Sequence, residues 1–184
     1  MSEVVRLTLV SHGMTEAMAA GRFPADEPLN ALGARQVADL AATRTGTDPG
    51  ILCCGPEQRA GQTAQALRGP AAIEPALADL DCGRWRGMSL QDVDPAGLAS
   101  WLTDPTAAPH GGESIAALCD RVRHWLDGVA ARGGRHTAVT HPAVIRAVIL
   151  TALNAAPTSF WRVDIAPAAR VTVHFRGAWT LRLR

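Results

Sequence analysis

Short apolar segments typical of buried strands alternate along the chain with longer segments in which apolar residues recur at helical spacing. The strand-like segments are residues 4–10, 51–54 and 136–140. The helix-like segments are residues 30–44, 57–68, 113–132 and 142–153. Such alternation favours parallel strands covered by helices on both faces of the sheet. The sequence therefore predicts an α/β fold, a three-layer α/β/α sandwich with a mostly parallel central sheet.

The remaining segments carry weaker patterns. Residues 71–87 predict irregular structure, and residues 90–102 predict a weak helix interrupted by Pro95. Residues 103–112 form a loop rich in proline and glycine, and residues 160–183 predict two or three strands. No repeat or linker divides the chain, and 184 residues suit one domain over residues 1–184.

The chain contains no lysine, so all 18 basic residues are arginines. This excludes a Walker-type phosphate loop, a pyridoxal Schiff base and a lysine general base, because each needs a side-chain amine. The net charge of +1 argues against nucleic acid or an anionic membrane as a partner. Any anion must therefore be held by arginine, histidine or the backbone.

Cysteine spacing and apolar segments bear on the compartment. The cysteines lack the Cys-x-x-Cys spacing of zinc knuckles and redox pairs, and we expect reduced thiols; they are Cys53, Cys54, Cys82 and Cys119. The apolar run at 143–153 is interrupted by Arg146 and too short to span a bilayer, and the run at 7–10 is too short for a signal peptide. These features predict a cytoplasmic protein with no membrane partner.

Two histidines stand in equivalent places in the predicted fold. His12 and His141 each follow a short apolar strand, and Arg59 begins the helix after a third strand. In open α/β sheets ligands bind at the carboxyl ends of the strands, so these side chains can reach one site. A guanidinium group suits a phosphate because its donors form a planar fork.

The order of the motifs resembles the histidine phosphatase superfamily, branch 1, which has the phosphoglycerate mutase-like fold. The similar blocks follow the family's order over nearly the whole chain. They are Leu9-Val-Ser-His12-Gly-Met-Thr15, Gly21-Arg22, Arg59-Ala-Gly-Gln62-Thr63-Ala64, Leu77-Ala-Asp79, Gly111-Gly112-Glu113-Ser114 and Val139-Thr-His141-Pro-Ala-Val-Ile145-Arg146.

The resemblance implies a role for each catalytic residue. His12 would be the nucleophile and would carry the phosphoryl group as phosphohistidine. Arg59 and His141 would bind the phosphoryl oxygens and oppose the charge that develops during transfer. Asp79 takes the place of the family's usual glutamate and would be the general acid and then the general base.

The resemblance also implies the binding groups and partners. The substrate-binding set comprises Ser11, Thr15, Arg22, Arg59 and the backbone at Ala143, which lies at a helix N-terminus. No metal or other cofactor is expected, because arginine and histidine supply the positive charge. The expected partner is a small phosphorylated substrate, and a homodimer is compatible with the family.

Two positions depart from the family pattern. Ser11 stands where the family has the arginine of its Arg-His-Gly motif, and Met18 stands where asparagine is common. A charge-assisted hydrogen bond is worth about 1.5–3 kcal/mol, so losing the arginine would cost about one to two orders of magnitude in rate. Arg22, Arg84 and Arg86 are candidates to compensate. The loop match also places Trp85 beside the pocket.

Two functions remain open from the sequence. The first is a metal-independent phosphomonoesterase that acts through a phosphohistidine on a small organic phosphate, with weak activity because the first pocket arginine is missing. The second is a catalytically impaired or repurposed relative that binds a phosphorylated ligand or a protein partner. Retention of His12, Arg59, Asp79 and His141 favours the enzyme, whereas Ser11 together with Met18 favours the impaired relative.

Overall fold

The computed structural model describes residues 4–43 and 50–183. Within these residues, six strands form one sheet in the order β3-β2-β4-β1-β5-β6. Their bounds are β1 Val5–Ser11, β2 Ile51–Cys54, β3 Ala72–Ile73, β4 Arg135–Thr140, β5 Arg170–Phe175 and β6 Trp179–Arg182. Strands β3, β2, β4 and β1 pair in parallel, whereas β5 is antiparallel to both β1 and β6. The predicted mostly parallel sheet is confirmed.

Helices connect these strands. They are α1 Glu16–Ala19, α2 Ala31–Ala42, α3 Gln58–Arg68, α4 Pro95–Thr103, α5 Ile115–Arg132 and α6 Pro142–Ala152, with short 3₁₀ helices η1 Pro75–Leu77, η2 Gly83–Trp85 and η3 Pro157–Arg162. The Asn30 side chain accepts a hydrogen bond from Gly33 N, and Ser114 caps α5 in the same way. Such caps satisfy amides that have no partner in the first helical turn. Pro142 begins α6, where its missing N–H costs nothing.

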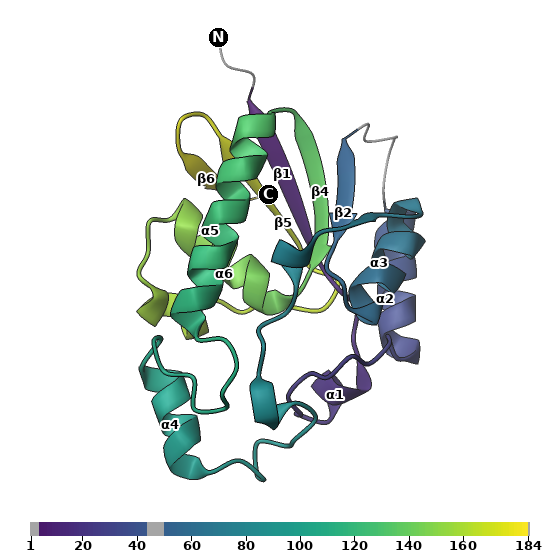
Figure 1. Ribbon diagram of the computed structural model, residues 1–184. Coiled ribbons are helices and arrows are strands. Elements are labelled where there is room, and N and C mark those ends of the chain that lie inside the picture. Colours follow the sequence, from purple (N-terminus) through teal and green to yellow (C-terminus); the bar gives the residue numbers. More distant parts are fainter. Residues whose placement is uncertain (1–3, 44–49, 184) are drawn as a thin grey trace.

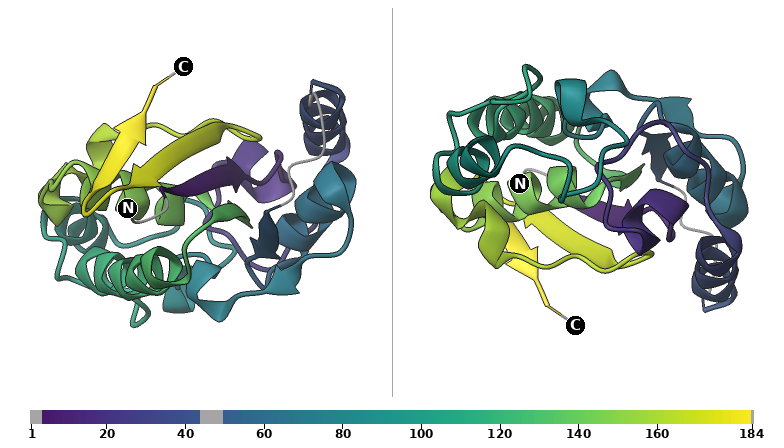
Figure 2. Two further views of the ribbon diagram at one scale, coloured as in Figure 1. Left: turned by 90° about the horizontal axis from the view of Figure 1, so that it is seen from above. Right: turned by 90° about the horizontal axis from the view of Figure 1, so that it is seen from below.

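The sheet separates two hydrophobic cores. Val10, Cys54 and Val139 pack with Ala60 and Ala64 of α3 on one face. The neighbouring strand residues point to the other face, where a larger core forms against α5 and α6. Helices α5 and α6 lie together beside the strands, and α2 and α3 lie side by side at the β2 end of the sheet (Figure 1, Figure 2), where α3 packs on the face opposite the larger core. The three-layer α/β/α architecture is therefore confirmed.

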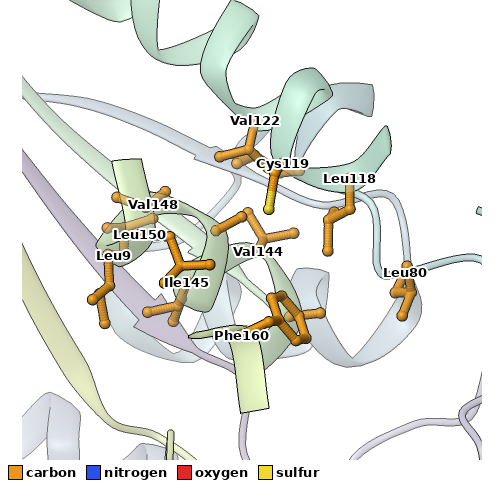
Figure 3. Close-up of a cluster of buried hydrophobic side chains, with 14 of the residues drawn as sticks. Leu9, Leu80, Leu118, Cys119, Val122, Val144, Ile145, Val148, Leu150 and Phe160 are labelled. Atoms are coloured by element: carbon orange, nitrogen blue, oxygen red, sulfur yellow. The ribbon is translucent and has the colours of Figure 1, made fainter. Parts of the chain in front are cut away.

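The larger core reaches the edge of the functional pocket. Its labelled members in Figure 3 come from β1, α5, α6 and η3 and include Leu9, Leu118, Val122, Val144, Ile145, Val148 and Phe160. Phe160 is almost fully buried and packs beside this cluster, while Leu80 lies at its border. Both side chains also line the pocket described below. The core thus fixes one wall of that pocket.

Three segments differ from the expectations based on the sequence. Pro95 begins α4 instead of interrupting a helix, because proline is compatible with the first helical turn. Residues 71–87 contain β3 and two 3₁₀ helices, and Phe160 lies in η3 rather than in a strand. The end of the predicted helix at Arg44 lies outside the described residues. In the described part of the chain, no helix combines the length and apolarity needed to cross a membrane.

The carboxyl ends of β1 and β4 point toward the same edge of the sheet, on the side of α1 and α4 (Figure 1). Close packing holds the turn after β1. A Cβ atom on Gly13 would lie 2.6 Å from Gly33 O, and one on Gly33 would lie 2.1 Å from Met14 O. Only glycine allows α2 to approach this turn so closely. The packing therefore sets the position of His12.

Candidate active site

A small pocket opens at this edge of the sheet. His12 follows β1, Arg59 lies in the first turn of α3 after β2, and Asp79 follows η1. These three side chains line a cavity of about 180 Å³, and we call them the pocket floor. His141, which follows β4, is fully buried directly behind Asp79. The volume is below the roughly 300–1,000 Å³ of drug-sized pockets, which suits a small ligand.

His12 is held as a neutral imidazole with one nitrogen free. Its Nδ1 lies 2.7 Å from Gly13 O. A carbonyl oxygen only accepts, so Nδ1 carries the proton and Nε2 keeps its lone pair. Burial, followed by the neighbouring charge of His141, lowers the pKa of His12 to about 4. An uncharged ring with a free Nε2 has the electronic state that a nucleophile needs at neutral pH.

One carboxylate oxygen of Asp79 lies between the Arg59 guanidinium and the His141 ring. Asp79 Oδ2 is 2.7 Å from Arg59 Nη2 and 3.4 Å from His141 Nδ1. Burial alone would raise the pKa of Asp79, but His141 and Arg59 outweigh it and lower that pKa overall. The Arg59 guanidinium is almost fully buried and also donates to Ala25 O at 2.7 Å. An anionic oxygen is therefore already bound where Arg59 and His141 meet.

Glu57 fixes the ring of His141. Its Oε2 lies 2.7 Å from His141 Nε2, and its Oε1 accepts from Asp79 N at 2.9 Å. Burial raises the pKa of Glu57, but the hydrogen bond from His141 outweighs it, so the carboxyl group stays ionised. Gly55 makes room for this contact, since a Cβ atom there would lie 3.0 Å from both Glu57 Oε2 and His141 Nε2. His141 Nδ1, which has no hydrogen-bond partner, faces Asp79.

Above the floor, rings of four residues form what we call the aromatic wall: Phe23, Trp101, Phe160 and Trp161. The ring centroids of Trp101 and Trp161 are 4.5 Å apart, and those of Phe160 and Trp161 are 4.9 Å apart. Both pairs meet edge to face, a favourable geometry for aromatic rings. Trp85 lies beside the pocket as its loop implied, but it packs behind Trp101 at 5.8 Å and does not line the cavity itself.

The structure brings most of the expected binding residues to the pocket. Arg22 and Ala143 line it, together with Met18. Ser11 is fully buried outside the lining, and its hydroxyl lies 3.5 Å from His12 O. Thr15 is also buried outside the lining, where its hydroxyl caps α1 and contacts Glu27.

The two further arginines proposed as compensating cations remain outside the pocket lining. Arg84 instead donates to Pro109 O, and Arg86 makes no contact with the floor. Three other features were not anticipated: Glu57, Arg146 and the aromatic wall. Glu57 stands only two positions before Arg59, and Arg146 follows Ala143 by three positions, a spacing that places both on one helical face. These two spacings are the sequence signals that could have pointed to Glu57 and Arg146.

No group of three or more His, Cys, Asp or Glu side chains within residues 4–43 and 50–183 is arranged to hold a metal ion. The expectation of metal-independent chemistry stays a prediction. Cys82 lines the pocket, and burial raises the pKa of its thiol to about 12, so it is not ionised at neutral pH. All four cysteines are free.

This fold, with two histidines and an arginine at the ends of parallel strands, defines the class of phosphoglycerate mutase-like α/β proteins. The crystal structure of a phosphoserine phosphatase from Entamoeba histolytica has the same fold, with a TM-score of 0.86 at 24% identity over 96% of this chain and 94% of that one. Residues 7–183 match the histidine phosphatase superfamily (branch 1), and the chain belongs to this family.

Curated relatives include phosphatases. A glucosyl-3-phosphoglycerate phosphatase from Mycolicibacterium vanbaalenii is 30% identical over 177 residues, which cover 87% of this chain and 79% of that protein. A bifunctional protein from Mycobacterium tuberculosis is 30% identical over 193 residues, or 97% of this chain. The chain spans about half of that relative, 53% of its length.

Proposed function

We propose that the chain is a metal-independent phosphomonoesterase that transfers the phosphoryl group of a small organic phosphate to His12. The observation that carries the proposal is the state of His12, a buried neutral ring whose free Nε2 shares one small pocket with Arg59 and Asp79. Two relatives that this chain matches over most of their length are named as phosphatases, which adds support. A cytoplasmic location and a homodimer stay predictions.

In the starting state of the first step, Arg59 and His141 hold the Asp79 Oδ2 oxygen. An incoming phosphoryl oxygen takes the place of Asp79 Oδ2 beside these two groups. Asp79 then loses the charges that keep its pKa low, and it takes up a proton from solvent. His12 Nε2 forms a bond to phosphorus as the ester P–O bond breaks, and Asp79 gives its proton to the leaving oxygen.

The second step returns the site to its starting state. The Asp79 carboxylate accepts a proton from water, the water oxygen bonds to phosphorus, and the N–P bond to His12 breaks. Inorganic phosphate leaves, His12 is neutral again, and Asp79 releases its proton to solvent as its oxygen returns to Arg59 and His141. Arg22 and the Ala143 backbone line the path of the phosphate and are proposed to bind it, while Ser11 and Thr15 act by holding the turns around His12.

The resemblance implies that Ser11 replaces an arginine of the family motif, and we propose that the Glu57–His141 pair compensates in part for this loss. Glu57 accepts the Nε2 proton and directs His141 Nδ1 toward the anion. When His141 also carries a proton on Nδ1, that N–H donates to the phosphoryl oxygen, and the Glu57 carboxylate balances the positive charge of the ring. Glu57 is thus a positioning residue, because it acts through His141.

The deciding experiment compares the intact chain with His12→Ala on phenyl phosphate and a panel of metabolite phosphates in the presence of a chelator. We expect hydrolysis that survives the chelator and disappears in His12→Ala, with a phosphohistidine trapped by rapid acid quench of the wild-type protein. Hydrolysis that persists in a folded His12→Ala variant would overturn the proposal.

A second function is favoured by two observations at the pocket. Ser11 is uncharged and lies outside the lining, and the apolar Met18 lines it. These features suit a catalytically impaired or repurposed relative that binds a phosphorylated ligand or a protein partner. The same assay separates the two functions, because this one predicts phosphate binding by calorimetry without turnover of any ester.

A further inference from the structure

His110 is a buried histidine that the proposed reaction does not use. It stands in the loop between α4 and α5, and the residue is 1% exposed. Its ring packs edge to face on two tryptophans, with centroid distances of 5.0 Å to Trp85 and 6.2 Å to Trp101. Trp101 is the member of the aromatic wall that α4 contributes, whereas His110 and Trp85 do not line the cavity. His110 therefore supports the wall from outside the pocket.

One hydrogen bond fixes the ring of His110 and its tautomer. Gly112 N donates to Nδ1 of His110 at 3.0 Å. An amide N–H only donates, so Nδ1 keeps its lone pair and the neutral ring carries its proton on Nε2. In the described part of the chain, the buried Nε2 has no hydrogen-bond partner. The arrangement fits only the neutral ring, because both nitrogens of a charged ring donate and Nδ1–H would face the amide of Gly112.

The backbone around His110 is held too closely to relieve this conflict. His110 O accepts from Arg84 N at 3.0 Å. A Cβ atom on Gly83 would lie 2.3 Å from His110 O and 2.7 Å from Gly112 N, so the loop fits tightly against η2. A protonated ring can separate from the Gly112 amide only by turning about its side-chain bonds. That rotation changes its contact with Trp101.

The charged groups around His110 do not stabilise a protonated ring. Burial lowers the pKa of His110, and the charges of Asp81 and Arg84 act on it in opposite directions. The other charged residue beside η2, Arg86, is exposed. Charged groups of the packed segments have other partners: Asp81 accepts from Gly83 N, Glu113 pairs with Arg121, Asp94 accepts from Gly97 N, Asp104 accepts from Thr106 N, and Arg84 donates to Pro109 O. The ring is therefore neutral at neutral pH and is protonated only in acid.

We propose that His110 is a positioning residue whose neutral ring holds Trp101 in the aromatic wall and whose protonated ring releases it. The ring centroids of Trp101 and Trp161 are 4.5 Å apart, so a shift of Trp101 disturbs both members of the wall. The pocket then favours an aromatic leaving group at neutral pH and loses that preference in acid, while the floor still holds the phosphoryl group. The inference rests on the proposed function for the phosphate end of the ligand.

Binding of two phosphonates at two pH values tests this role without any need for turnover. The ligands are benzyl phosphonate and methyl phosphonate, measured by calorimetry at about pH 7.5 and about pH 5, on either side of the usual range for histidine. Protonation of His12 or of the phosphonate affects both ligands and cancels in the ratio of their affinities. In the wild-type chain, the preference for benzyl phosphonate should fall about two- to tenfold in acid, the contribution of one aromatic contact.

His110→Asn should make the preference independent of pH. Its amide oxygen can accept from Gly112 N in place of Nδ1, and the side chain does not titrate. His110→Gln offers the same acceptor and serves where the first variant does not fold. NMR of the wild-type chain provides a second readout: the Trp101 indole N–H signal, assigned with Trp101→Phe, should move with the same midpoint as the His110 ring.

His124→Asn is the matched control, because His124 is exposed on α5, where its Nδ1 lies 2.7 Å from Asp120 O, and it does not line the pocket. It should keep the wild-type dependence on pH. A preference that stays constant in the wild-type chain would overturn the role of His110, and so would an equal fall in His110→Asn or a Trp101 signal that does not respond. If the preference changes with pH while no ester is hydrolysed, the proposed function fails and the role of His110 stands.

Discussion

The pocket floor and the aromatic wall meet in one small cavity but are built in different ways. In the floor, His12 follows a strand, Arg59 begins a helix and Asp79 follows η1, and hydrogen bonds fix their rings and charges. Wall residues come from α4, η3 and the loop after α1, and ring packing fixes them. The floor is charged and almost closed to solvent, whereas Trp161 of the wall is 37% exposed.

From this difference we expect the floor to perform the reaction and the wall to select the substrate. A strand end has little freedom, so the floor keeps its geometry whatever ligand enters. Connecting segments tolerate change, and binding preferences often reside in them for that reason. We therefore expect floor substitutions to change kcat or the stability of the charge arrangement, and wall substitutions to change KM. Four substitutions test this division.

The largest effect is expected for Asp79→Asn. It should lower kcat for an alkyl phosphate by about 10²–10⁴-fold, the usual range for a positioned general acid and base. The loss should be smaller for 4-nitrophenyl phosphate, whose leaving group needs no proton. Because Asp79 Oδ2 occupies the place between Arg59 and His141, inorganic phosphate should inhibit the variant more strongly. Steady-state kinetics with both esters measures these changes.

Asp127→Asn is the control for Asp79→Asn, because Asp127 is exposed on α5 and does not line the active pocket. Its kinetics should match the wild type. If Asp79→Asn instead weakens phosphate inhibition along with kcat, Asp79 serves mainly to hold Arg59 in place, and the proposed exchange of anions is wrong.

Glu57→Gln should have the next largest effect. The variant loses the charge on the carboxylate that accepts from His141 Nε2, and kcat/KM should fall by about 10- to 100-fold. Affinity for vanadate should fall by a similar factor, and affinity for phosphate should fall less, because the pair acts on developing charge. The readout is vanadate inhibition together with kcat/KM.

A nearby glutamate provides the comparison for Glu57. Glu74 caps η1 through Ala76 N and makes no contact with His141, so Glu74→Gln should retain wild-type kinetics. Equal losses of vanadate and phosphate affinity in Glu57→Gln would point to a general disturbance of the pocket instead of a contribution to the transition state.

A third prediction concerns stability and needs no substrate. The pKa of His12 is about 4 in the folded protein and 6.5 in the reference state, so the unfolded chain takes up this proton first as the pH falls. Stability is therefore lost on the acid side, by about 2 kcal/mol for this residue between about pH 7 and pH 5. Urea denaturation of the wild type and His12→Asn at both pH values measures the difference. Parallel changes in the two proteins would contradict the buried neutral state.

Much of the floor, and the position of His141 behind it, could be predicted from the sequence. Strand periodicity placed His12 and His141 at strand ends, and the parallel sheet brings such ends to one edge. The same pattern placed Arg59 at this edge, because the helix that it begins follows the strand at residues 51–54. Glu57 was missed although it lies beside Arg59, because its contact with His141 joins positions 84 residues apart. Local patterns carry no information about such pairings.

The wall could not be predicted for a related reason. Trp101 and Trp161 meet across 60 positions of sequence, and one of them lies in a 3₁₀ helix that has no apolar periodicity. The sequence analysis placed only Trp85 beside the pocket. A tryptophan's neighbours depend on how connecting loops fold back, and Trp85 turned out to support Trp101 from behind.

The smallest effect is expected at the wall itself, for Trp161→Ala. Its ring packs edge to face on Trp101 and lies over the guanidinium of Arg146. Removing an aromatic contact of this kind costs about 0.5–1.5 kcal/mol, so KM for phenyl phosphate should rise about two- to tenfold with kcat nearly unchanged. Trp161→Phe should keep most of the affinity because it retains a ring.

Methyl phosphate provides the internal control for Trp161→Ala, since its leaving group is too small to reach the wall. Its kcat/KM should stay close to the wild-type value, so the variant should lower the preference for phenyl over methyl phosphate. A fall in kcat for both esters would mean that Trp161 also holds the floor in place. The division between a floor that performs chemistry and a wall that selects the leaving group would then fail at the residue where it is weakest, the most exposed member of the wall.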